Sequence, residues 1–185
     1  MNSTDNLKGS SRLMQQVRDT KFIGITGKAR SGKDTVGEML SQNLSIATDS
    51  FAQPIKDMLK AGLGLEDKAL RAEALYTKNY RQLVQTLGTE WGREMVCDSI
   101  WLEAMLSRRL GLKTIITDVR FENEAELIRQ YGTLIHVVRF NQEEIEESDH
   151  RSEDGIAEKE GDIIIYNDSS LEILKEKVAQ WTNHL

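Results

Sequence analysis

Short hydrophobic runs alternate along the chain with longer stretches in which apolar residues recur every three or four positions. Four β-branched runs predict buried parallel strands: FIGIT (22–26), KTIITD (113–118), TLIHVVRF (133–140) and DIIIYN (162–167). Helices are predicted over 35–44, 121–132 and 169–185. In the last of these, Leu171, Leu174 and Val178 would share one face. Strands that alternate with helices indicate an α/β domain built on a parallel sheet.

Two segments interrupt this alternation. Residues 65–110 have helical periodicity almost throughout, and Pro54 stands near the start of an earlier helix. The segment 141–162 is acidic and nearly free of large apolar residues, which is typical of a closing lid or of a solvated loop. We therefore predict a polar lead-in over 1–20 and a single domain over 21–185. That domain would carry a helical insertion over about 47–110 and a small lid over about 140–161.

Composition narrows the class of protein. Of 185 residues 39% are hydrophobic, and 24 Lys and Arg stand against 30 Asp and Glu, a net charge of −6. This acidic balance disfavours a nucleic-acid polymer as partner. The chain has no apolar run of membrane-spanning length, its start lacks the apolar stretch of a signal peptide, and Cys97 has no second cysteine to pair with. We expect a cytoplasmic protein without a membrane partner.

The segment GKARSGKDT (27–35) follows the first predicted strand and opens the first predicted helix. Gly27, Gly32 and Lys33 match the phosphate-binding pattern G-x-x-x-x-G-K-[ST], but Asp34 stands where a hydroxyl is usual and Thr35 comes one place late. Glycines let backbone N–H groups point at phosphate oxygens, and the helix N-terminus adds its positive end. An ordinary glycine turn is the alternative, and the strand–loop–helix context disfavours it.

Other residues of this loop add charge and oxygen atoms. Lys28 and Arg30 suit a strongly anionic ligand, although either could be simply solvated. Asp34 could bind Mg²⁺ in place of the hydroxyl, could orient the phosphate acceptor, or could favour the first helical turn by its charge alone. The residues predicted to contact ATP here are Gly27, Lys28, Arg30, Ser31, Gly32, Lys33, Asp34 and Thr35.

A second candidate segment, TDVRFENE (117–124), follows the strand predicted at 113–118. Ligands of open α/β sheets bind at the carboxyl ends of strands, so Asp118 could bind Mg²⁺ or its water shell and contact the substrate. Arg120 could bridge two phosphates during transfer. The alternative for Asp118 is a helix N-cap, because a helix follows.

The helical insertion carries cations, an amide and indole rings that together suit a phosphorylated acceptor: Lys56, Arg81, Gln85, Trp91 and Arg93. Taken singly, each is more commonly a surface cation or a core aromatic. We expect Phe51 and Trp91 to be mainly packing residues. Beyond the last strand, Asn167 could present its amide to adenine, although asparagine is also an ordinary turn residue.

Together these segments resemble phage and prophage deoxynucleoside monophosphate kinases, a family of P-loop kinases. The resemblance runs through FIGITGKARSGKDT, FAQPIK, RQLVQTLGTEWGRE, ITDVRFENE, HRSE and YND, nearly everything after residue 20. In that family SGKD is a recurring form, so the aspartate after the lysine becomes part of the match. Phosphomevalonate kinases are similar in this loop and in the aspartate-x-arginine strand end.

The resemblance implies a parallel sheet flanked by helices, with a helical acceptor-binding insertion and a lid. It also implies transfer of the γ-phosphoryl group of ATP to the 5′-phosphate of a deoxynucleoside monophosphate (dNMP), with Mg²⁺. Lys33 would bind the ATP phosphates, and Arg120 would stabilise the transferring group with Arg139 and Arg151 from the lid. Arg81, Gln85 and Arg93 would hold the dNMP.

Two other functions stay open on the sequence. One is a kinase for another small phosphorylated metabolite, such as phosphomevalonate. The other is a P-loop NTPase switch, which the lack of a guanine-reading N-K-x-D disfavours. The base, the sugar and the oligomeric state are not determined, although homodimers are common at this size.

Overall fold

The computed structural model describes residues 19–63, 80, 82–139 and 155–182. The chain divides into two compact units. Unit 1 draws on the segments Met1–Asp49 and Leu106–Leu185, and unit 2 is the segment Ser50–Met105. Among the helices of these described stretches, none is long and apolar enough to span a lipid bilayer.

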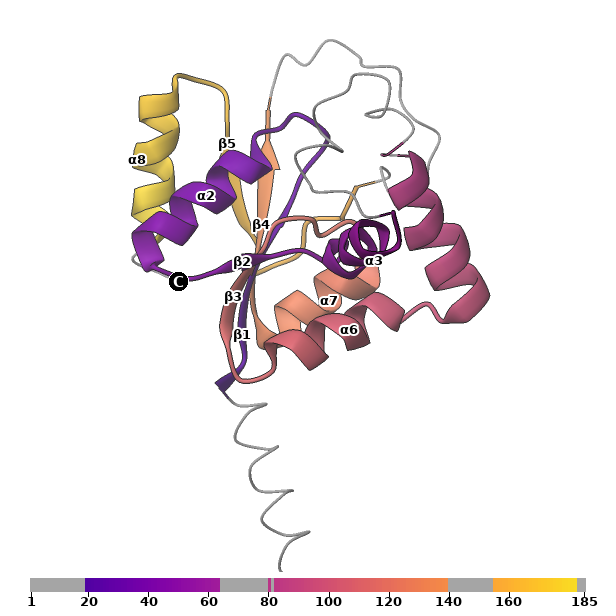
Figure 1. The fold of residues 1–185 in the computed structure, drawn as a ribbon. Helices are drawn as coiled ribbons and strands as arrows, with labels where there is room; N and C mark the ends of the chain where they lie inside the picture. The colour runs from indigo at the N-terminus through magenta and orange to yellow at the C-terminus, as the bar shows by residue number, and fades with distance from the viewer. Residues whose placement is uncertain (1–18, 64–79, 81, 140–154, 183–185) are drawn as a thin grey trace, which may run out of the picture. The chain divides into compact units, whose positions relative to one another are not determined.

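Unit 1 is built on a five-stranded sheet in the order β2-β3-β1-β4-β5, and every neighbouring pair is parallel (Figure 1). Its strands are β1 (Lys21–Thr26), β2 (Thr48–Asp49), β3 (Lys113–Ile116), β4 (Gly132–Val138) and β5 (Ile163–Tyr166). The four longer strands are those that the hydrophobic runs predict. The parallel α/β architecture is therefore confirmed, and only the two-residue edge strand β2 was not predicted.

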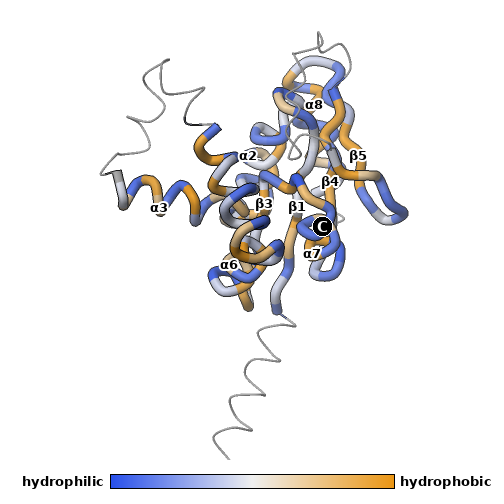
Figure 2. Tube along the Cα trace, turned by 90° about the vertical axis from the view of Figure 1, so that its right-hand side faces the viewer, coloured by the Kyte–Doolittle hydropathy of each residue, from blue (hydrophilic) through white to orange (hydrophobic). Residues whose placement is uncertain are grey.

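Helices cover both faces of the sheet because side chains alternate along its central strand. Ile23 and Ile25 of β1 join a core with residues of α2 (Lys33–Leu44) and α8 (Leu171–Thr182). On the opposite face, the ring of Phe22 lies 5.8 Å from that of Tyr131 in α7 (Glu122–Tyr131). Strands β4 and β5 carry long hydrophobic stretches, orange in Figure 2, as expected of strands buried between helices.

Helix α8 corrects one part of the predicted face. Leu174 and Val178 are buried, whereas Leu171 is 50% exposed. Leu171 is the first residue of the helix, three positions before Leu174, and lies beyond the edge of the packed stripe. The face predicted from the helical spacing is therefore buried at its second and third residues and exposed at its first.

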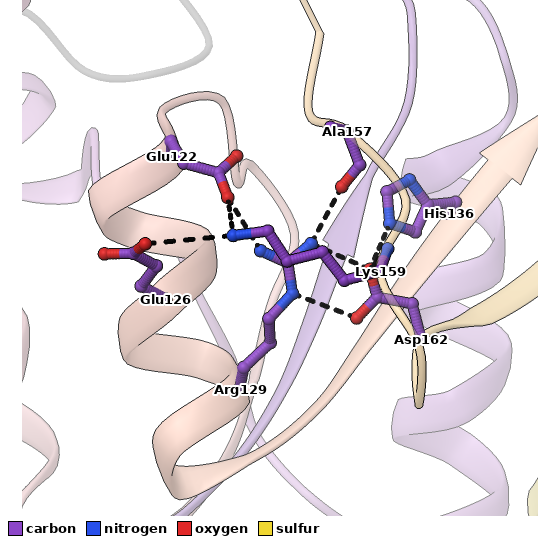
Figure 3. Close-up of polar contacts among 7 residues, drawn as sticks. All are labelled: Glu122, Glu126, Arg129, His136, Ala157, Lys159 and Asp162. Atoms are coloured by element: carbon purple, nitrogen blue, oxygen red, sulfur yellow. Dashed lines mark hydrogen bonds and ion pairs between the residues drawn. The ribbon is translucent and has the colours of Figure 1, made fainter.

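A charged network ties the segment before β5 to α7 and β4 (Figure 3). The Asp162 carboxylate accepts hydrogen bonds from Arg129 Nε at 3.0 Å and Nη2 at 2.7 Å, and from the Lys159 backbone N–H at 2.9 Å. His136 Nε2 lies 2.9 Å from the same carboxylate. Burial alone would raise the pKa of Asp162, but these hydrogen bonds outweigh it and lower the pKa to about 2. Asp162 is thus ionised in the folded protein at neutral pH.

Unit 2 is helical over its described residues. It contains α3 (Gln53–Leu63), the π-helix η1 (Leu87–Val96) and the beginning of α6 (Ile100–Arg109), whose last turn belongs to unit 1. The Cys97 N–H bonds to the Gly92 carbonyl five residues earlier, at 2.9 Å, and so continues the π-helical pattern. The buried apolar residues of this unit are Phe51, Ile55, Leu59, Trp101 and Met105. The interpretation of Phe51 as a packing residue is confirmed, whereas the π-helix was not predicted.

Candidate active site

The glycine loop between β1 and α2 turns tightly through residues with positive φ angles. Gly27, Arg30 and Gly32 have positive φ values of 150°, 62° and 97°, and the Ser31 N–H bonds to the Lys28 carbonyl at 3.1 Å. A left-handed conformation at Arg30 is unusual for a residue with a Cβ, and such residues gather at ligand sites. Lys28 and Arg30 are exposed, while Ser31 is buried.

Asn167 closes this loop from the end of β5. Its side-chain Nδ2 donates to the Ser31 carbonyl at 2.8 Å, and its backbone N–H bonds to Val138 of the neighbouring strand at 2.7 Å. Gly32 must be glycine here for two reasons: its φ is left-handed, and an added Cβ would collide with Asn167 Nδ2. The role predicted for Asn167 toward adenine stays a prediction, and the structure adds a bond that holds the loop.

The N-terminus of α2 is suited to an anion. Its N-cap, Gly32, provides no side-chain hydrogen bond to the first-turn amides. The buried Ser31 Oγ has no hydrogen-bond partner within the described part of the chain. Lys33 is the first residue of the helix, followed by the exposed Asp34 and the half-buried Thr35. Uncapped amides, a hydroxyl without a partner and a lysine are the groups that bind phosphate.

The segment after β3 lies beside this loop. The Val119 N–H bonds to the Ile25 carbonyl of β1 at 3.2 Å, two residues before Gly27. Thr117 packs against α2 so closely that a methyl group on Gly37 would lie 2.8 Å from Thr117 Cγ2. Asp118 stands between these two contacts. Because both contacts are made to the elements that flank the glycine loop, Asp118 and the loop share one edge of the sheet.

Helix α7 excludes the alternative role of Asp118 as an N-cap. The N-cap is Phe121, and the buried Glu124 carboxylate accepts the backbone N–H groups of Arg120 at 2.8 Å and Phe121 at 3.1 Å. Glu124 thereby fixes the backbone at Arg120. It was not singled out from the sequence, although a glutamate three residues after the N-cap is the capping-box spacing.

The oxygen atoms at this edge fit a Mg²⁺ ion. Asp34, Thr35 and Asp118 provide two carboxylates and a hydroxyl, the hard donors that Mg²⁺ prefers. Among the described residues there is no group of three or more His, Cys, Asp or Glu that could hold a metal by itself. This donor set suits an ion that keeps several waters and shares phosphate oxygens.

In unit 2, the predicted acceptor residues have different environments. Arg93 is 4% exposed, and its Nη1 donates to the Asp98 carbonyl oxygen at 2.8 Å. Gln85 is half-buried, and its buried Nε2 has no hydrogen-bond partner among described residues. Trp91 is 36% exposed, with its ring 6.4 Å from that of Trp101. Lys56 is half-buried on α3.

Some predicted residues lie outside the described part of the chain or next to a gap in it. Arg81 and Arg151 are outside the described residues. Arg139 follows β4 directly and is exposed. Of the lid predicted over 140–161, only 155–161 are described, and the Ala157 carbonyl of this stretch accepts from Arg129 Nη2 at 2.9 Å.

A family model and two phage proteins agree on one kind of enzyme. A family model described as deoxynucleotide monophosphate kinase matches residues 21–80 and 64–178. The chain is 35% identical to a deoxynucleoside-5′-monophosphate kinase of Escherichia phage T5, over 75% of this chain and 86% of the relative. It is 33% identical to a deoxynucleotide monophosphate kinase of Escherichia phage RB69, over 56% of this chain and 45% of the relative.

Among solved structures, a gluconokinase from Sinorhizobium meliloti 1021 aligns with 89% of this chain and 93% of its own, at 11% identity and a TM-score of 0.49. The matched residues of the family model include the glycine loop, the Asp118 segment and unit 2.

Proposed function

The chain belongs to the deoxynucleotide monophosphate kinase family, and we propose that it transfers the γ-phosphoryl group of ATP to the 5′-phosphate of a dNMP at the loop described above. It is thus a phosphotransferase of the P-loop kinase fold. The observation that carries the proposed chemistry is the uncapped N-terminus of α2, preceded by a glycine loop with a buried hydroxyl. ATP and a dNMP are the small molecules that this reaction requires.

On the donor side, the loop amides and Lys33 bind the phosphates of ATP. The amides of the first turn of α2 point along the helix axis toward the anion, and the helix dipole adds to their attraction. Lys33 neutralises charge on the β- and γ-phosphates. Asn167 holds the Ser31 carbonyl and so keeps the loop in its binding conformation before ATP arrives.

The strand-end segment acts on the transferring group. Arg120 offers a planar guanidinium that stabilises charge spread over the phosphoryl oxygens, as positioned arginines do in phosphoryl transfer. Glu124 fixes the Arg120 backbone and so contributes to its placement. Arg139 and Arg151 stay our candidates for further charge neutralisation from the lid.

Asp34, Thr35 and Asp118 would hold Mg²⁺. When bound, the ion neutralises phosphate charge and orients the phosphate chain. Orientation of the acceptor phosphate is the alternative role for Asp34.

On the acceptor side, the dNMP phosphate and base would bind residues of unit 2. Arg93 and Arg81 would hold the phosphate, and the unsatisfied Gln85 Nε2 would donate to an acceptor atom of the nucleotide. Lys56 would add positive charge and Trp91 a ring for contact with the base. No general base is required, because the acceptor phosphate is already anionic at neutral pH. A cytoplasmic location and the choice between monomer and homodimer stay predictions.

Product analysis tests this function directly. The purified protein is incubated with ATP, Mg²⁺ and one acceptor at a time: each of four dNMPs, the matching ribonucleotides and phosphomevalonate. Chromatographic detection of a deoxynucleoside diphosphate and ADP in equal amounts is the expected result. Lys33→Ala serves as the inactive variant, and Lys175→Ala, which removes an exposed lysine of α8, serves as its matched control.

The outcomes separate the alternatives. Phosphorylation of phosphomevalonate alone would move the acceptor to another class of metabolite while keeping the loop chemistry. Release of phosphate without any phosphorylated acceptor would indicate an NTPase and contradict the kinase function. Full turnover by Lys33→Ala would contradict the assignment of the loop.

A further inference from the structure

A buried carboxylate stands at the point where the chain leaves unit 1 for unit 2. Asp49 is the last residue of β2 and the last of unit 1 before the insertion, and its side chain is 2% exposed. Arg109 Nε lies 2.5 Å from Asp49 Oδ2, and both Nε and Nη2 of Arg108 lie 3.4 Å from the same oxygen. Two arginines therefore share one carboxylate oxygen.

The two arginines mark the point where the chain returns. Unit 1 resumes at Leu106, and Arg108 and Arg109 are in the last turn of α6. The ion pairs thus join the residue at which the insertion departs to the turn in which it comes back. We call Asp49, Arg108 and Arg109 the junction cluster.

The edge strand depends on this cluster more than a longer strand would. Strand β2 has two residues and, among the described strands, pairs only with β3. The Asp49 carbonyl accepts the Thr117 N–H at 3.2 Å, directly before Asp118. Asp49 therefore connects the departing chain, the returning helix and the strand-end segment that carries Asp118.

We propose that Asp49 is a positioning residue for the acceptor: its ion pairs with Arg109 and Arg108 fix both attachment points of unit 2, and thereby the placement of the dNMP for transfer. This inference rests on the proposed function, because that function assigns the dNMP to unit 2. An insertion joined to its parent domain by two chain crossings takes its orientation from them. Residues at the ends of helices and strands absorb the φ and ψ changes that alter such an orientation.

A purely structural role is the competing explanation. Breaking any buried ion pair destabilises a fold, wherever it lies. The Asp162–Arg129 pair offers the matched case. Asp162 is 4% exposed, is paired with Arg129, and precedes β5, at the edge of the sheet opposite to β2.

The test compares Asp49→Asn with Asp162→Asn in steady-state kinetics and thermal unfolding. For Asp49→Asn we expect kcat/KM for the dNMP to fall about 10- to 100-fold, because a misplaced reactant lowers the rate of transfer by about this much. KM for ATP should stay within about twofold of wild type. For Asp162→Asn we expect a lower Tm with both substrate constants near wild type. Arg109→Met should behave as Asp49→Asn, and the double variant should be no worse than the poorer single variant.

Two results would overturn the positioning role. One is a lowered Tm in Asp49→Asn with kcat/KM for the dNMP unchanged. The other is an equal effect of both asparagine variants on the dNMP. If Asp49→Asn does not fold, Arg109→Lys replaces it, since it keeps the charge but loses the fork, and the same criteria apply. If the wild type phosphorylates no dNMP, the proposed function fails together with this inference, whereas an active wild type isolates the junction cluster.

Discussion

The glycine loop of unit 1 and the helices of unit 2 differ in what holds their polar groups in place. In the loop, the groups proposed to bind phosphate belong to the backbone: positive φ values at Gly27, Arg30 and Gly32 and an uncapped helix start are properties of a short run of neighbouring residues. In unit 2, Gln85 and Arg93 are side chains placed by helix packing, and the carbonyl that Arg93 contacts belongs to Asp98, after the π-helix.

Because of this difference, ligand binding and stability are expected to be separable in the loop and coupled in unit 2. A loop exposed to ligand can lose affinity while the core of unit 1 stays intact. A buried arginine such as Arg93 contributes both to the stability of the fold and to the binding of an anion that it contacts. Substitutions in the loop should therefore affect the kinetics for ATP, and substitutions in unit 2 the kinetics for the dNMP. Only those in unit 2 should also lower stability clearly.

After the inactive variant Lys33→Ala, the largest effect is expected from Gly32→Ala. The added methyl group would collide with Asn167 Nδ2 and strain a backbone at φ 97°, so the loop must change shape. We expect kcat/KM for ATP to fall about 100-fold, a loss typical of a displaced phosphate-binding group. Steady-state kinetics with ATP varied measures it.

The control for this variant lies in unit 2. Gly62 is in helix α3, and a Cβ there would meet nothing within 4 Å. Gly62→Ala should leave kinetics unchanged and stabilise the helix by about 0.5–1 kcal/mol. Normal ATP kinetics in Gly32→Ala would show that the loop does not bind through its backbone.

Arg93→Met should affect the acceptor side next most strongly. It removes a buried guanidinium, so we expect KM for the dNMP to rise about 10-fold and the free energy of unfolding to fall about 1–3 kcal/mol. KM for ATP should not change. Arg93→Lys keeps the charge without the planar fork and should be intermediate. A loss of stability in Arg93→Met with unchanged dNMP kinetics would make Arg93 structural only.

Asn167→Ala tests the bond that closes the loop. Loss of the 2.8 Å hydrogen bond to Ser31 should raise KM for ATP by about 5- to 10-fold, equivalent to about 1 kcal/mol. Asn43→Ala is the control, because Asn43 is an exposed asparagine of α2 whose side-chain Nδ2 lies 3.4 Å from Thr182 Oγ1, a long contact. Equal kinetics for the two variants would contradict the role of Asn167 in the loop.

Asp162 should have the smallest effect on activity and a clear one on stability. Its pKa is lowered from 3.8 to about 2, so the ionised carboxylate contributes about 2 kcal/mol of stability above pH 4. That contribution should disappear as the pH falls from about 4 through 2, since protonation then costs the folded state its hydrogen bonds. Urea unfolding of wild type and Asp162→Asn across this range measures it, and parallel curves for the two proteins would contradict the assignment.

Some tertiary contacts leave a trace in the sequence and others leave none. The capping role of Glu124 can be predicted from its spacing to Phe121. The hydrogen bond of Asn167 to the glycine loop is suggested by the position of an amide at a strand end. No local sequence pattern predicts the junction cluster, because Asp49 ends a strand of two residues and pairs with arginines about 60 positions later. The π-helix likewise shows no period distinct from an α-helix in so short a stretch.

The sequence by itself determined the four longer strands, the helices α2, α7 and α8 that follow three of them, the position of the glycine loop and the family. These follow from hydrophobic periodicity and from backbone geometry that only glycine adopts readily, and both act over a few neighbouring residues. Tertiary structure alone decided that Leu171 is exposed, that Asp118 is not a helix cap, that Asp162 stays ionised and that Asp49 joins the two ends of the insertion. Burial and ion pairing depend on which distant segments meet, and chain order does not specify those meetings.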